Sequence, residues 1–265
     1  MKWTIFFLML FNLPVLNAQS VKWKLERIVQ VDNQEVLIDQ LNNLYAIRKG
    51  EVLKLNQKGE ELSRYSNKLI GKEIHVDVTN PMKVVLYSAD QMRVIVLDSR
   101  LGEIREPINL LKLGYEQITL VATSHSNCLW LYDPINFKLI RLTENLEEER
   151  TSLSLSQMLR LQLYPTDLVE VNNKVYLTDP NHGVFEFDVF GNYLRKIPIR
   201  NIETLTISDN RLFYRNDEQL VAFNLSNSNS ENVELEIASL NTFSVNRDRI
   251  VVPTPTSAII YQALR

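Results

Sequence analysis

The chain has 265 residues and a formal net charge of −3, which argues against a general nucleic-acid binder because such proteins are usually basic. Apolar residues make up 45% and charged residues 23%, the balance of a soluble globular protein with material for one large all-β domain or two small domains. Cys128 is the only cysteine, so no intrachain disulfide can form and packing alone must stabilise the fold.

The first twenty residues, MKWTIFFLMLFNLPVLNAQS, have the layout of a secretory signal peptide. Lys2 precedes an apolar stretch, and Ala18 stands at the expected cleavage point. A membrane anchor is the alternative, but the apolar run has about ten residues where about twenty are needed to span a bilayer. The sequence therefore predicts a signal peptide over 1–18 and a single domain over 19–265. It also predicts export to the periplasm or outside the cell, with an outer-membrane complex as a further expectation.

From residue 35 onward, one pattern of strands and turns recurs six times. NKVYLTDPNHGVFEFDVFGN, residues 173–192, shows it clearly: VYLTD and VFEFD alternate apolar and polar residues, and DPNHG and DVFGN are dense in turn residues. The copies are spaced about 38 to 50 residues apart, close to the period of propeller blades. Their third strand ends on Asn or Asp in four copies, at Asn56, Asp98, Asp188 and Asn224.

Four antiparallel strands per copy, repeated six times, predict an all-β fold: a six-bladed β-propeller with four-stranded antiparallel blades. A β-sandwich with accidental periodicity is the alternative. The sixth copy ends at Leu264 after three strands, while the segment 21–31 precedes the first copy without a partner. We therefore expect this N-terminal strand to close the last blade, which would leave no open sheet edge. The segment 144–165 is an insertion outside the repeat, and its middle, LSQMLRLQL, is either a short helix or a strand extension.

The repeat resembles that of six-bladed propellers of the NHL and TolB-like type. Their blades read as a short strand, Asn or Asp, "lYv.D" and then "v.vfd..G", and the best matches are NNLYAIRKGEVLKLNQKG, residues 42–59, and residues 173–192. The resemblance covers 35–264 and implies the architecture, not a subfamily. Several turns lack the expected glycines and no blade carries the full NHL consensus.

Few residues have the spacing of known catalytic motifs. The three histidines, His75, His125 and His182, fall at different places in the repeat and are not expected to converge on a zinc ion. Cys128 lies in NCLWLY, which is typical of a buried strand. The sequence contains no nucleophile elbow and no glycine-rich phosphate loop.

One constellation is a predicted ring of acidic residues at the channel mouth. Because the first strand of each propeller blade lines the central channel, a residue at or just before that strand should face its mouth. Five copies place a carboxylate there and the sixth has Asn241; the five are Glu35, Glu73, Glu116, Asp167 and Glu203. Such a ring would hold calcium, which takes six to eight oxygen ligands, or attract a basic partner or cationic ligand. Ordinary solvated loop carboxylates are the alternative.

These features favour a non-enzymatic protein that presents loops from a rigid ring to a protein partner or a ligand. We expect no nucleic-acid partner, and no membrane-spanning segment once the signal peptide is removed. The alternative is a propeller hydrolase, lactonase or lyase with a metal at the channel mouth. Carbohydrate binding or ligand sensing is not separated from the first interpretation by the sequence.

Overall fold

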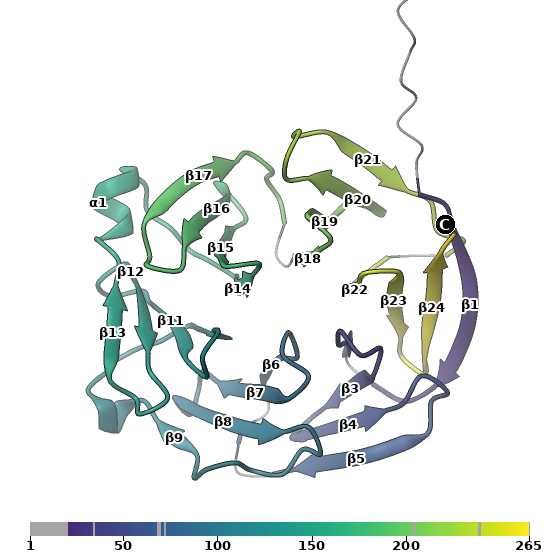
Figure 1. Ribbon diagram of the computed structural model, residues 1–265, viewed down its shortest axis with the longest axis horizontal. Coiled ribbons are helices and arrows are strands. Elements are labelled where there is room, and N and C mark those ends of the chain that lie inside the picture. Colours follow the sequence, from purple (N-terminus) through teal and green to yellow (C-terminus); the bar gives the residue numbers. More distant parts are fainter. Residues whose placement is uncertain are drawn as a thin grey trace, which may run out of the picture.

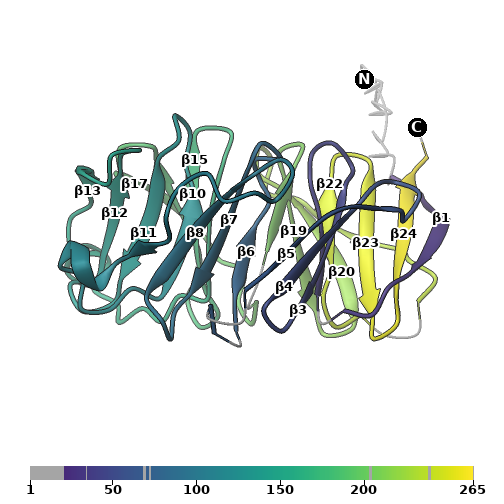
Figure 2. The same ribbon diagram turned by 90° about the horizontal axis from the view of Figure 1, so that it is seen from below.

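The computed structural model describes residues 21–33, 35–67, 70–71, 73–202, 205–237 and 240–264. Six four-stranded antiparallel sheets form a ring around a central axis, which confirms the predicted all-β, six-bladed propeller (Figure 1). Seen from the side, the ring is a disc whose strands run between its two faces (Figure 2). The predicted signal peptide, 1–18, lies outside the described residues.

The first five blades are each built from four consecutive strands, which follow one another from the channel outward. Blade 1 contains β2 (Glu35–Ile38), β3 (Leu44–Arg48), β4 (Glu51–Leu55) and β5 (Glu61–Ser66). Blade 2 contains β6 (His75–Asp77), β7 (Lys83–Ser88), β8 (Arg93–Asp98) and β9 (Ile108–Asn109). Blade 3 contains β10 (Leu120–Thr123), β11 (Leu129–Asp133), β12 (Lys138–Leu142) and β13 (Glu148–Thr151). Blade 4 contains β14 (Asp167–Val171), β15 (Lys174–Asp179), β16 (Gly183–Asp188) and β17 (Tyr193–Ile197). Blade 5 contains β18 (Thr206–Ser208), β19 (Arg211–Asn216), β20 (Gln219–Asn224) and β21 (Ser230–Val233).

The last blade is completed by the N-terminal strand, as expected from the sequence. Blade 6 contains β22 (Ser244–Asn246), β23 (Arg249–Thr254), β24 (Ser257–Ala263) and then β1 (Trp23–Gln30). β1 pairs antiparallel with β24, and Val29 of β1 also packs on blade 1: a Cβ added at Gly59 would lie 2.7 Å from its Cγ1. The closing strand therefore joins the two ends of the described chain and contacts the next blade.

The turns between third and fourth strands explain the recurring Asn and Asp. Asp98 Oδ1 accepts hydrogen bonds from the backbone N–H groups of Arg100 and Gly102, both at 2.8 Å. This bond pattern folds the turn back, and in blades 1, 2 and 4 the residue three positions after the Asn or Asp takes a left-handed conformation. Gly59 and Gly191 occupy that position in blades 1 and 4, with φ of 85° and 83°. In blade 2 Leu101 occupies this position with φ of 61°, so the turn forms there without a glycine.

The apolar core lies between the blades, because each sheet buries both faces against its neighbours. The cluster between blades 3 and 4 contains Trp130, Phe185 and Phe187, all fully buried. The prediction that 144–165 lies outside the repeat is wrong for its first part, because β13 is the fourth strand of blade 3. After β13 the segment forms α1 (Leu155–Leu159), whose Leu155 is fully buried in this cluster. Figure 1 shows α1 at the outer edge of the ring, between blades 3 and 4.

Two further observations concern the chain as a whole. Among the described residues, no helix has the length and apolar character needed to cross a membrane. Cys128 is buried directly before β11, and burial raises the pKa of its thiol, so this cysteine packs as an apolar residue.

Candidate functional site

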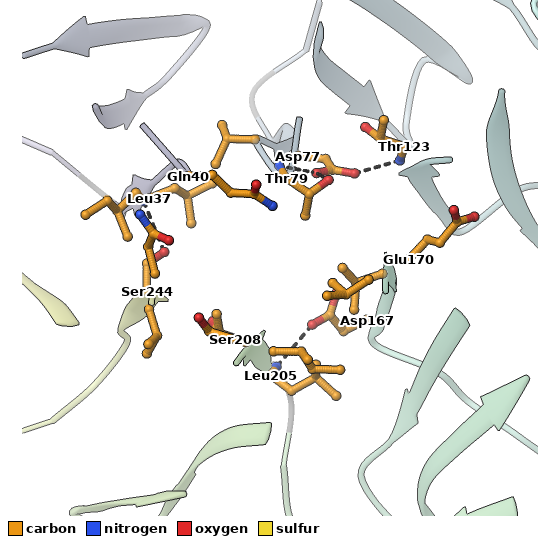
Figure 3. A pocket seen from close by; sticks show the side chains of 18 of the residues that line it. Leu37, Gln40, Asp77, Thr79, Thr123, Asp167, Glu170, Leu205, Ser208 and Ser244 are labelled. Carbon is orange, nitrogen blue, oxygen red and sulfur yellow. Dashed lines mark hydrogen bonds between the residues drawn. The ribbon is translucent and has the colours of Figure 1, made fainter. Parts of the chain in front are cut away.

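A cavity of about 530 Å³ follows the axis of the ring. The innermost strands β2, β6, β10, β14, β18 and β22 all contribute to its wall, together with the turns that follow them (Figure 3). We call the end where these strands begin the N-terminal end of the channel, and the opposite end the C-terminal end. The volume lies within the range of about 300 to 1,000 Å³ typical of ligand sites.

Several polar side chains of the wall tie adjacent blades together. Asp77 Oδ2 in blade 2 accepts a hydrogen bond of 2.6 Å from the backbone N–H of Thr123 in blade 3 (Figure 3). Asp167 Oδ2 in blade 4 accepts one of 3.1 Å from the N–H of Leu205, which precedes the first strand of blade 5 (Figure 3). Both aspartates are more than nine-tenths buried, and their carboxylates satisfy backbone donors that would otherwise be unpaired.

Glu170 joins blades 3 and 4 through a denser network. Its carboxylate accepts hydrogen bonds from Ser124 Oγ at 2.6 Å, Trp130 Nε1 at 2.6 Å and the backbone N–H of His125 at 3.1 Å. Burial alone would raise the pKa of Glu170, but the bonds from Ser124, His125 and Trp130 stabilise the ionised form and hold the pKa below its ordinary value. Glu170 is therefore an ionised, structural carboxylate.

The imidazole of His125 is fully engaged in the same network. Its Nδ1 lies 2.7 Å from Glu170 Oε1 and its Nε2 lies 3.0 Å from Nη2 of the buried Arg141. Because a guanidinium can only donate, Nε2 must accept and Nδ1 must donate to Glu170. Neither ring nitrogen is left to act as a general base.

At the N-terminal end, Glu35 and Asp167 lie close enough to influence each other across the channel. Burial raises the pKa of Glu35, the nearby charge of Asp167 adds to the rise, and His75 opposes it. Burial likewise raises the pKa of Asp167, against the opposing effects of His75 and of the N–H groups of Leu205 and Leu168. Strands far apart in sequence thus bring two carboxyls and an imidazole to one end of the cavity.

The five carboxylates of the predicted ring are not equivalent. Glu35 and Asp167 line the channel cavity. Glu73 is exposed and lines a second cavity at the channel mouth, which shares Glu35 and His75 with the first. Glu116 is exposed and lines neither cavity, and Glu203 lies outside the described residues. Within the described part of the chain, no group of three or more His, Cys, Asp or Glu side chains is placed to hold a metal, so calcium stays a prediction.

The sequence pattern missed three wall residues. His75, Asp77 and Glu170 line the channel from β6 and β14. The period of two along an inner strand predicts that Asp77 faces the same side as His75, but which of them contacts another blade depends on the packing of the ring. His182 lines neither cavity and bonds locally to Asp179 at 2.9 Å.

Comparisons with known proteins show similarity in fold only. No family model and no curated protein matches the sequence. Among solved structures, a virginiamycin B lyase from Staphylococcus aureus is 12% identical over 92% of this chain and 100% of that chain, with a TM-score of 0.62. A chain of a mitotic checkpoint complex is 8% identical over 100% of this chain and 99% of that chain, also at 0.62. The Cps50 (Swd1) propeller domain of Myceliophteria thermophila is 9% identical over 91% and 100%, at 0.61. The NHL and TolB-like resemblance stays a prediction.

Proposed function

We propose that the protein is an exported, non-enzymatic β-propeller that binds a protein partner. The proposal rests on the hydrogen bonds that several ionisable side chains around the channel already make within the protein. Asp77, Asp167 and Glu170 accept hydrogen bonds from neighbouring blades, and both ring nitrogens of His125 are engaged. Groups used in this way make the ring rigid and are poorly placed to bind or protonate a substrate.

The surface best suited to a partner is an apolar patch on the outer rim between blades 3 and 4. We define it by Leu153, Phe190 and Leu194, which are 75%, 56% and 46% exposed. The turn that carries Phe190 contacts the insertion, since a Cβ added at Gly191 would lie 3.5 Å from Ser152, next to Leu153. Exposed apolar side chains gathered in one place are typical of interaction sites. A similar propeller belongs to the mitotic checkpoint complex, which agrees with such a role.

Site-specific photo-crosslinking in the producing cells tests this proposal. A photoreactive residue at Leu153 or Leu194 should capture the same polypeptide, and Phe190→Ser in the same chain should abolish the capture. The matched control is Leu62 on β5, which is 53% exposed on the outer strand of blade 1 and should capture nothing specific. Equal capture from Leu62, or none from either rim position, would contradict the proposal.

A channel hydrolase, lactonase or lyase is the second candidate, and one observation favours it. His75 lies near Glu35 and Asp167 in the cavity, and no described residue engages its ring in a hydrogen bond. This is an arrangement in which an imidazole and carboxyls exchange protons with a substrate. One of the similar structures is a lyase. Turnover of a lactone that His75→Ala abolishes without loss of fold would establish this candidate.

A further inference from the structure

The C-terminal end of the channel cavity carries uncharged polar side chains on three adjacent blades. Gln40 follows β2 of blade 1, Ser208 is the last residue of β18 in blade 5, and Asn246 is the last residue of β22 in blade 6. Because β22 contacts both β18 and β2 and the inner strands run in the same direction, these residues belong to one end of the channel. Figure 3 shows the Gln40 side chain reaching into the channel from blade 1, with Ser208 at the wall.

The hydroxyl of Ser208 is available to a ligand. Ser208 is 9% exposed and lines the cavity, and its Oγ makes no hydrogen bond to any described residue. The hydroxyls of Thr123 and Thr178 also lack a described partner but are closed off from solvent, whereas that of Ser208 keeps surface open to the cavity. Polar groups buried to this extent are usually hydrogen-bonded, so a molecule in the channel must supply the partner.

Asn246 presents an acceptor to the same space. Its Nδ2 donates to the backbone carbonyl of Asp39 at 2.6 Å and to Asn42 Oδ1 at 2.9 Å. Since a backbone carbonyl can only accept, the bond to Asp39 fixes which side of the amide is the nitrogen. Asn246 is 5% exposed and lines the cavity, and its Oδ1 accepts no hydrogen bond from a described residue. Blade 1 therefore holds this amide in one orientation and leaves its acceptor unused.

Gln40 and two turn residues extend this polar set toward the channel mouth. Gln40 is exposed, and its amide makes no hydrogen bond to a described residue. Asp209 and Arg247, which directly follow Ser208 and Asn246, are exposed, line the same cavity and form no ion pair within the described part of the chain. Their charges are opposite, so the two turns together add no net charge to this end.

The unpaired atoms favour a ligand that both donates and accepts hydrogen bonds. Ser208 Oγ can do either, Asn246 Oδ1 only accepts, and the Gln40 amide offers a donor and an acceptor. A hydroxyl matches all three, whereas an ammonium only donates and a carboxylate only accepts. Burying a charged group beside neutral partners is also costlier than burying a hydroxyl. Leu37 and Val169, half-buried in the wall, add apolar surface for the carbon-bound hydrogens of a ligand.

We propose that the C-terminal end of the channel binds a neutral sugar in its pyranose form. Hydroxyls of the ring bond to Ser208 Oγ, Asn246 Oδ1 and the Gln40 amide, and a C–H face of the ring lies against Leu37 and Val169. A rigid ring holds its hydroxyls in place and loses less conformational entropy on binding than an open-chain polyol. This site is separate from the rim patch, so failure of either proposal leaves the other standing.

Saturation-transfer NMR and calorimetry with defined probes test the proposal. The probes are D-glucose, D-galactose, D-mannose and N-acetyl-D-glucosamine, and at least one should bind to the full protein. Cyclohexanol, a six-membered ring with a single hydroxyl, and L-alanine, a zwitterion, should bind more weakly than that sugar. Ser208→Ala should weaken the sugar about three- to tenfold, the effect of one neutral hydrogen bond. The Tm should not change, because no described residue uses this hydroxyl.

Ser63→Ala is the matched control. Its hydroxyl also lacks a partner among the described residues, but it lies on β5 outside both cavities, so its loss should leave the affinity unchanged. Gln40→Ala changes an exposed residue and should also weaken the sugar, which gives a second test that does not disturb a buried position. Absence of sugar binding at about 100 mM would overturn the proposal. Tighter binding of L-alanine than of every sugar, or equal affinity in Ser208→Ala and Ser63→Ala, would also overturn it.

Discussion

Replacing Val29 by Ala should measure how much the closing strand contributes to the stability of the ring. Val29 lies on β1, is 5% exposed and packs in the cluster shared by blades 6 and 1. The substitution removes two methyl groups, worth about 0.8 kcal/mol each on burial, and leaves a small cavity. We therefore expect a loss of about 2 kcal/mol in the free energy of unfolding. For a chain of this size that corresponds to a fall in Tm of about 4 to 8 °C.

The neighbouring residue provides the control. Ile28 lies on the same strand but is 52% exposed, so Ile28→Ala should change the stability by less than about 0.5 kcal/mol. Both variants keep the strand pairing of β1 with β24, which depends on the backbone. Thermal melts followed by circular dichroism, together with urea titrations, compare the two.

Deletion of 21–31 is the stronger form of the same perturbation. It removes the outer strand of blade 6 and exposes the edge of β24, which can then pair with other molecules. The truncated protein should aggregate or melt far below the intact one. A truncated protein that stays monomeric with an unchanged Tm, or equal effects of Val29→Ala and Ile28→Ala, would refute the reasoning that this strand closes the ring.

Three further outcomes are expected. Glu170→Gln should lower the stability by about 2 kcal/mol at neutral pH; since the pKa of Glu170 lies below its ordinary 4.5, this difference should persist above that pH and shrink as the pH falls through the folded pKa, which urea titrations across pH 3 to 7 would show. Asp77→Asn should cost about 1 to 3 kcal/mol, because an amide cannot accept from both Thr123 and the local turn donors, and an unchanged unfolding midpoint would contradict the blade-linking role. Mass spectrometry of the exported protein should find its N-terminus at Gln19, whereas an intact chain held in membranes would contradict the signal peptide.

The repeat and its closure could be predicted from the sequence because both depend on local rules. The period of two identifies strands wherever it occurs, and the Asn or Asp at the end of a third strand sets the turn through bonds within five residues. Leu264 ends the sixth copy one strand short, so the spare strand at 21–31 had one place to pair. The sequence left open whether the middle of the segment 144–165 is a helix or a strand. The structure shows a helix, α1, packed between two blades.

The roles of the channel carboxylates were decided by the tertiary structure. From the sequence, Glu35, Glu116 and Asp167 are equivalent, since each stands at or just before the predicted start of an inner strand. The packing of the ring buries Asp167 against the backbone N–H of Leu205, leaves Glu116 in solvent and places Glu35 in the cavity. These differences depend on contacts between segments that are far apart along the chain, and no local pattern encodes them. The sequence by itself therefore determined the strands, the turns and the ring, while contacts between blades decided which acidic groups hold the ring together and which face an open channel.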